Sequence, residues 1–299
     1  MRSSYKLCLL CWSLLLVAAR KRHNDTLKMK SVQPTVILPH QLLHALNQSA
    51  VDRENLSDKV DAHMYFIMYG IFLMPLIHRV EYAKSERQLK FLEIGMGCDM
   101  TYGPGKSVYM WKKLFGVKAD LWVAEFDAAC VENARLRNLT LGIRTLVGDQ
   151  ANEIVLKSWL DESGGDFDVI IDDGGHKNHQ IMKTFTFLFN KALAPGGLYF
   201  IEDLSVGRRG PYYDAKTDIV VSDVLQSWVE QLLIPHWDDY KGTDSAVLRK
   251  RERYPLPQSL KWIFCQSEAC VIGKCELELL DDSGNCRRPP YFTRHHQSP

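Results

Sequence analysis

The sequence lacks an apolar run long enough to cross a membrane comfortably, because its N-terminal run is only Leu7–Ala19 and a spanning helix takes about 20 apolar residues. It also lacks an excess of one charge, since 37 Lys and Arg residues stand against 36 Asp and Glu residues. Two short basic clusters, at 20–22 and 249–251, are typical of solvated surface. We therefore expect no nucleic-acid partner, which would require a basic face.

The four cysteines near the C-terminus lack the C-x2-C spacing of a structural zinc site. They are Cys265, Cys270, Cys275 and Cys286, out of eight cysteines in the chain. Such a cluster suits disulfides in an oxidising compartment. The sequence does not determine their pairing, and four free thiols are the alternative.

The N-terminus has the pattern of a targeting segment. Basic residues precede the run Leu7–Ala19 and follow it at 20–22, which predicts a secretory signal cleaved after Ala19 or a short signal-anchor at 1–19. Glycosylation triplets begin at Asn24, Asn47, Asn55 and Asn138. We expect the secretory pathway (a luminal or secreted protein), with membrane contact only through an uncleaved N-terminal segment. A cytoplasmic protein is the alternative.

A polar lead-in at 20–58 and a helical lead-in or lid at 59–89 precede the main domain. The helical segment is rich in Met, Tyr, Phe and Ile, and Pro75 either ends it or kinks it. We see no internal repeat. A polar tail is expected at 281–299.

From residue 90 to about 280, short apolar runs alternate with helical patterns. Strands are expected at 90–95, 121–125, 144–147, 167–172 and 198–202, and helices at 107–115, 128–136, 152–159, 178–193 and 220–233. This alternation predicts an α/β, doubly wound, mostly parallel sheet of Rossmann-like type. Two late runs, at 260–264 and 270–273, predict a terminal antiparallel hairpin at the sheet edge.

The first strand ends in a glycine-containing turn with the sequence Glu93-Ile94-Gly95-Met96-Gly97. Glycines at a strand end allow a tight turn and close approach to a ligand. The dinucleotide motif G-x-G-x-x-G is incomplete, because Met100 stands at its third glycine. An acid before the first glycine instead resembles the E-x-G-x-G pattern of methyltransferases, with Asp99 at its last position.

The next two strand tips offer further cofactor contacts. Glu125 ends the second strand, where a carboxylate can accept both ribose hydroxyls of a nucleoside. Its neighbour Asp127 is the weaker candidate, since it is also placed to cap the following helix. Asp149 and Gln150 follow the third strand and resemble the adenine-contacting position. Asp149 has the alternative role of a helix cap.

Acidic residues gather after the fourth and fifth strands. The first group is Asp172, Asp173 and His176, and the second is Glu202 and Asp203. Neighbouring parallel strands would bring these side chains together, and a divalent cation would relieve the repulsion between carboxylates. Helix capping is the alternative, but it explains only one of the acids.

These motifs together resemble class I S-adenosylmethionine-dependent methyltransferases, and within them the metal-dependent macrolide sugar O-methyltransferases. The resemblance covers about residues 90–205 and rests on segments 95–111, 148–150, 172–176 and 201–203. It implies Mg²⁺ or a similar cation held by Asp173, Glu202 and Asp203, with His176 as base. Glu93, Gly95, Gly97, Glu125, Asp149, Gln150 and Asp172 would then serve the S-adenosyl-L-methionine site.

The predicted reaction is methyl transfer to a hydroxyl of a sugar or polyketide-type acceptor, either a small molecule or a glycoconjugate. A cation would lower the pKa of the hydroxyl, and His176 would take its proton. The alternatives are a methyltransferase-fold binding module without turnover and, less favoured, a nicotinamide-dependent oxidoreductase. A homo-oligomer is left open. The bacterial enzymes are cytosolic, so the N-terminal segment and the triplets depart from that pattern.

Overall fold

The computed structural model describes residues 57–82, 87–213, 219–234 and 245–287. The predicted targeting segment, nearly all of the polar lead-in and the asparagines of three of the four glycosylation triplets lie outside these residues. In the described part, no helix combines the length and apolar character needed to cross a membrane.

One seven-stranded sheet with the order β3-β2-β1-β4-β5-β7-β6 organises the chain. Its strands are β1 (Leu89–Ile94), β2 (Ala119–Glu125), β3 (Arg144–Val147), β4 (Phe167–Asp172), β5 (Leu193–Ile201), β6 (Leu260–Gln266) and β7 (Ala269–Lys274). The first five run parallel, and β7 pairs antiparallel with both β5 and β6. The doubly wound sheet and its terminal hairpin are therefore confirmed.

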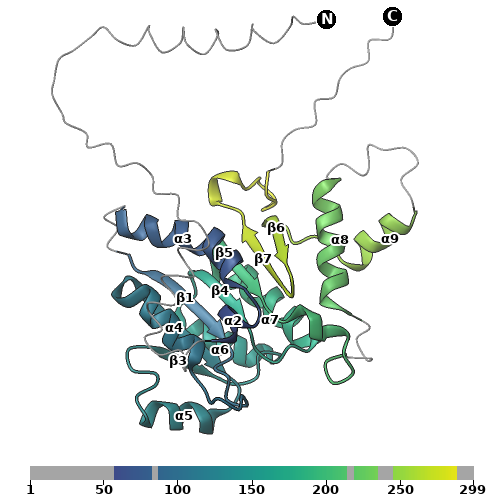
Figure 1. The fold of residues 1–299 in the computed structure, drawn as a ribbon. Helices are drawn as coiled ribbons and strands as arrows, with labels where there is room; N and C mark the ends of the chain where they lie inside the picture. Colours follow the sequence, from purple (N-terminus) through teal and green to yellow (C-terminus); the bar gives the residue numbers. More distant parts are fainter. Residues whose placement is uncertain (1–56, 83–86, 214–218, 235–244, 288–299) are drawn as a thin grey trace, which may run out of the picture. The chain divides into compact units, whose positions relative to one another are not determined.

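Helices cover both faces of the sheet. They are α2 (Asp58–Asp61), α3 (Phe66–Tyr82), α4 (Lys106–Phe115), α5 (Ala128–Leu136), α6 (Glu153–Ser163), α7 (Asn178–Lys191), α8 (Val221–Leu233) and α9 (Ser245–Arg253). In Figure 1, α8 and α9 lie beside the hairpin end of the sheet. Short 3-10 turns occupy Gly116–Lys118, Leu204–Arg208 and Leu277–Leu279.

The alternation of side chains along the strands divides the core into layers. Phe91 of β1 packs with α3 and α4 on one face, whereas the next residue, Leu92, packs with α6, α7 and α8 on the other. All six residues of β4 are buried, as expected for a central parallel strand. The helical lead-in is thus part of the core, and α3 continues through Pro75 to Tyr82.

Several boundaries differ from the sequence-based expectation, and the largest shift is at the start of β5. The helix expected at 178–193 ends at Lys191, and β5 begins at Leu193 instead of Leu198. The early start of β5 results from strand pairing, because Leu193 pairs with Phe167 of β4 ahead of a register irregularity. The basic cluster 249–251 belongs to α9, which the sequence patterns did not predict.

Among the described residues, three disulfides join all six cysteines. Cys265–Cys270 bridges the β6–β7 hairpin, and Cys275–Cys286 closes the segment after it. The expectation of C-terminal disulfides is therefore met, with this pairing. A third bridge, Cys98–Cys130, was not expected and joins the loop after β1 to α5.

Candidate active site

The carboxyl ends of β1 and β4 meet at the first glycine turn. Gly95 donates its N–H to the carbonyl of Ala124 at 2.8 Å, and Asp173 donates its N–H to Ile94 at 3.0 Å. Gly95 has a φ of +101°, and a Cβ there would lie 2.1 Å from the carbonyl oxygen of Asp173. Only glycine fits at this close approach of the two backbones. The turn and the acidic strand tip are therefore packed directly against each other.

Glu125 and Asp127 have different roles at the end of β2. Asp127 accepts the N–H groups of Ala129 and Cys130 and caps α5. Glu125 instead reaches back to the glycine turn, where its Oε2 accepts the N–H of Met96 at 2.9 Å. This geometry agrees with the preference for Glu125 as the ribose-binding acid, although that role stays a prediction.

Gln150 and Asp172 form a buried, hydrogen-bonded pair behind the strand tips. Gln150 donates from Nε2 to Oδ1 of Asp172 at 2.9 Å and accepts the N–H of Gly175 at 2.8 Å. Tyr199 donates to the other Asp172 oxygen at 3.2 Å. Burial raises the pKa of Asp172 to about 6. Both residues therefore hold the β4–α7 loop in place, and neither is broadly exposed for a ligand.

Asp149, the other predicted adenine contact, accepts the N–H of Ala151 at 2.8 Å. It does not cap the next helix, because the N-cap of α6 is Asn152. The second glycine of the turn, Gly97, has a φ of +74° and lies beside Met100.

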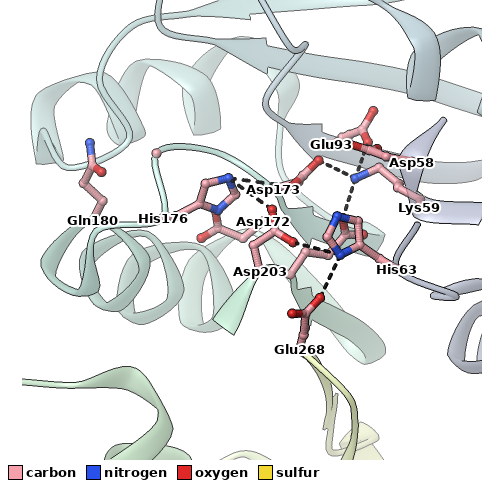
Figure 2. A network of polar contacts seen from close by, with 12 residues as sticks. Asp58, Lys59, His63, Glu93, Asp172, Asp173, His176, Gln180, Asp203 and Glu268 are labelled. Carbon is pink, nitrogen blue, oxygen red and sulfur yellow. Dashed lines mark hydrogen bonds and ion pairs between the residues drawn. The ribbon is translucent and has the colours of Figure 1, made fainter. Parts of the chain in front are cut away.

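The acidic tips of β4 and β5 converge with His176 (Figure 2). His176 Nε2 lies 4.0 Å from Asp173 Oδ1 and 3.6 Å from Asp203 Oδ2. One ligand atom from each of these three residues lies within 4.8 Å of the others, which is close enough for a shared cation. His176 and Asp203 have φ values of +56° and +54°. Non-glycine residues in this region cluster at functional sites.

Helix capping does not explain these acids. The N-cap of α7 is Lys177, so neither Asp172 nor Asp173 starts that helix. Of the predicted ligands, Asp173 and Asp203 lie in one group with His176, whereas Glu202 is linked to Asp173 through Lys59. Carboxylate oxygens suit a hard divalent cation, and the ligand set stays a prediction. In addition, Glu202 is 1% exposed, and its Oε1 has no hydrogen-bond partner among the described residues. An unpaired buried oxygen of this kind fits a cation ligand.

Sequence patterns missed Lys59, which enters the centre of the acidic cluster. Its ammonium lies 2.5 Å from Glu202 Oε2, contacts Asp173 Oδ2 and lies 3.5 Å from Glu93 Oε1. Lys59 is only 2% exposed. Burial alone would lower its pKa, but the charges of Asp173, Glu202 and Glu93 outweigh this effect and raise it. Lys59 is therefore a buried cation shared by three carboxylates.

One ammonium does not neutralise the whole cluster. Burial raises the pKa of both Glu93 and Glu202 to about 7, and the Lys59 charge opposes this rise only in part. Burial also raises the pKa of Asp173. Glu93 is further held by Ser107, whose hydroxyl donates to Oε2 at 2.8 Å. A second, divalent positive charge would stabilise the ionised forms.

The segment before α3 and the β6–β7 turn supply two more contacts that were not predicted. Tyr65 donates its hydroxyl to Asp203 Oδ1 at 2.7 Å. His63 Nδ1 lies 2.7 Å from Glu268 and 3.9 Å from Asp203 (Figure 2). The hydrogen bond to Glu268 and the charge of Asp203 raise the pKa of His63 against the effect of its partial burial. No local sequence motif marks these residues.

No protein-family model matches the chain. It is 34% identical over 160 residues to demethylmacrocin O-methyltransferase of Streptomyces fradiae, a match that covers 52% of this chain and 38% of that one. It is 36% identical over 120 residues to mycinamicin VI 2''-O-methyltransferase of Micromonospora griseorubida, covering 40% of this chain and 28% of that one. A third relative is 8-demethyl-8-alpha-L-rhamnosyl tetracenomycin-C 2'-O-methyltransferase of Streptomyces olivaceus. It is 31% identical over 151 residues, covering 50% and 35%.

Solved structures show the same fold. MycE methyltransferase of the mycinamycin biosynthetic pathway, in complex with Mg and SAH, matches in two crystal forms. The TM-scores are 0.50 and 0.52 at 23% and 21% identity. These matches cover 74% and 84% of this chain, and 52% and 57% of the solved chains. The fold is therefore that of class I methyltransferases, and this chain spans about a third of the length of the curated relatives.

Proposed function

We propose that this chain, which has the class I methyltransferase fold, is an S-adenosylmethionine-dependent O-methyltransferase that uses a divalent cation and methylates a sugar hydroxyl. The observation that carries the proposal is the convergence of Asp173, His176 and Asp203 within 4.8 Å, at the strand tips beside the Gly95 turn. Ligands bind at this edge of doubly wound sheets. The relatives support the acceptor class, since one of them is a 2'-O-methyltransferase of a rhamnosyl compound.

In this proposal, S-adenosylmethionine would supply the methyl group, and a cation held by Asp173, Glu202 and Asp203 would lower the pKa of the acceptor hydroxyl. The chain itself positions the reactants, which accounts for much of the acceleration in a displacement reaction. His176 would accept the hydroxyl proton at Nε2, the ring nitrogen that faces Asp173 and Asp203. The negative Asp203 would stabilise the imidazolium that forms.

A two-step experiment tests this function. Thermal shift with S-adenosylhomocysteine and with NAD first identifies the cofactor, because a ligand of the native state raises the melting temperature. A response to NAD alone would favour the oxidoreductase. Methyl-labelled S-adenosylmethionine is then incubated with p-nitrophenyl rhamnoside and other deoxysugar glycosides. We expect transfer that EDTA abolishes and Mg²⁺ restores, while cofactor binding survives EDTA. Full transfer in excess EDTA would contradict the metal-assisted mechanism.

We also propose that the protein works in the secretory pathway. The sequence of Leu7–Ala19 supports this compartment, as do the three disulfides, which persist in oxidising environments. Asn138 of the fourth triplet is exposed just after α5 and is accessible to modification. Expression in a eukaryotic host should give a product whose mobility shifts with an N-glycosidase, and Asn138→Gln should remove one step of the shift. An unglycosylated product that retains Met1 would contradict the proposal.

A further inference from the structure

The two oxygens of each predicted metal-ligand carboxylate have different surroundings. Asp173 contacts Lys59 through Oδ2, whereas its Oδ1 faces His176 at 4.0 Å. Glu202 contacts Lys59 through Oε2, whereas its Oε1 is buried without a hydrogen-bond partner. Asp203 accepts the hydroxyl of Tyr65 at Oδ1, whereas its Oδ2 faces His176 at 3.6 Å.

In each of these three carboxylates, a residue that precedes α3 contacts one oxygen. The other oxygen has no such contact. We propose that Lys59 and Tyr65 are positioning residues of the cation site, which fix Asp173, Glu202 and Asp203 so that their second oxygens can bind a divalent cation. This inference rests on the proposed function, because it concerns the same site. It adds residues from a part of the chain that lies well before the resemblance at 90–205.

The two positioning residues are also connected to each other. Tyr65 donates its backbone N–H to the carbonyl of Lys59 at 2.8 Å, so a short loop fixes their spacing. The Tyr65 hydroxyl donates to Oδ1 of Asp203 and accepts the backbone N–H of Asp203 at 3.2 Å. This pair of bonds fixes both the side chain and the left-handed backbone of Asp203.

The core holds this segment against the sheet. Tyr65 is 1% exposed and belongs to the same buried cluster as Phe200 of β5 and the apolar face of α3. The segment therefore does not need the cation in order to dock. Outer contacts that orient ligands are commonly worth 10- to 100-fold in metal affinity.

The test is calorimetric titration of the full chain with Mn²⁺, in parallel with titration by S-adenosylhomocysteine. Tyr65→Phe removes only the hydroxyl, and we expect Mn²⁺ to bind about 10- to 100-fold more weakly while S-adenosylhomocysteine affinity is unchanged. Tyr69→Phe is the matched control. It removes a buried hydroxyl at the start of α3, and that hydroxyl has no hydrogen-bond partner among the described residues. Mn²⁺ affinity should be unchanged in this variant.

Lys59→Met tests the second positioning residue. Weaker Mn²⁺ binding is expected, because Asp173 and Glu202 lose the group that orients them. Tighter binding would mean that the Lys59 ammonium competes with the cation, and this result would overturn its positioning role. If the wild-type chain binds no Mn²⁺, the metal-assisted function fails together with the inference. If the wild type binds Mn²⁺ and Tyr65→Phe binds it equally well, only the inference fails.

Discussion

The carboxylate of Glu125 accepts the backbone N–H of Met96 at 2.9 Å, which links the tip of β2 to the glycine turn after β1. The other oxygen of Glu125 accepts the N–H groups of Phe126 and Asp127 at 2.7 and 3.1 Å. One side chain therefore orders both loops that a nucleoside cofactor would meet at this edge of the sheet.

We expect Glu125→Ala to weaken S-adenosylhomocysteine binding by about tenfold or more, the scale of a lost hydrogen bond to a charged group. Calorimetry on the folded variant measures this loss. Asp127→Ala is the control, because Asp127 caps α5. That change should lower stability by about 1 kcal/mol and leave the affinity nearly unchanged. Equal affinities of Glu125→Ala and the wild type would reject the ribose-binding assignment.

His176→Ala should keep both cation and cofactor and lose about 10²- to 10⁴-fold in methyl-transfer rate, the usual contribution of a general base. Part of the rate should return at high pH, where the acceptor hydroxyl loses its proton without help. The rate is measured with labelled cofactor, and binding is measured by calorimetry. A variant with a wild-type rate at neutral pH would show that His176 is not the base.

Because of the buried Asp172, the free energy of unfolding should fall as the pH rises. Burial raises its pKa from 3.8 to about 6, so the folded state binds this proton more tightly than the unfolded chain does. The contribution to the free energy of unfolding is therefore complete below about pH 4. This contribution, roughly 3 kcal/mol, is lost as the pH rises through about 6.

Asp172→Asn removes the titrating group but keeps its shape, so this part of the pH dependence should disappear. Urea unfolding between pH 4 and 7.5, with EDTA present, measures the difference between wild type and variant. Parallel profiles for the two proteins would show that the folded-state pKa of Asp172 is not raised.

The Cys98–Cys130 disulfide should stabilise the fold more than the hairpin disulfide does. It closes a sequence separation of 32 residues, against 5 residues for Cys265–Cys270. By chain entropy, the first is worth about 4 kcal/mol and the second about 2 kcal/mol. Urea unfolding of Cys98→Ser/Cys130→Ser and Cys265→Ser/Cys270→Ser, at a fixed pH, compares them. A larger loss in the hairpin variant would contradict this order.

Local patterns predicted most of the sheet, because a buried parallel strand and the turn after it are recognisable in a few residues. The boundaries 144–147 and 167–172 are those of β3 and β4. The start of β5 was wrong by five residues, from 198 to Leu193, since its pairing with Phe167 depends on a neighbouring strand. The grouping of Asp173 with Asp203 was also predictable, because tips of adjacent parallel strands meet at one edge.

The sequence by itself determined the strand tips and the chemistry of the acids on them, since both depend on neighbouring residues in the chain. Only the tertiary structure decided what surrounds those acids. Lys59 and Glu202 are 143 residues apart, and Cys98 and Cys130 are 32 apart. No periodicity connects such pairs, because they meet only after the helices have packed on the sheet. Lys59 in particular has no local pattern of its own. It is held at the site by three carboxylates, which lie at the ends of three different strands.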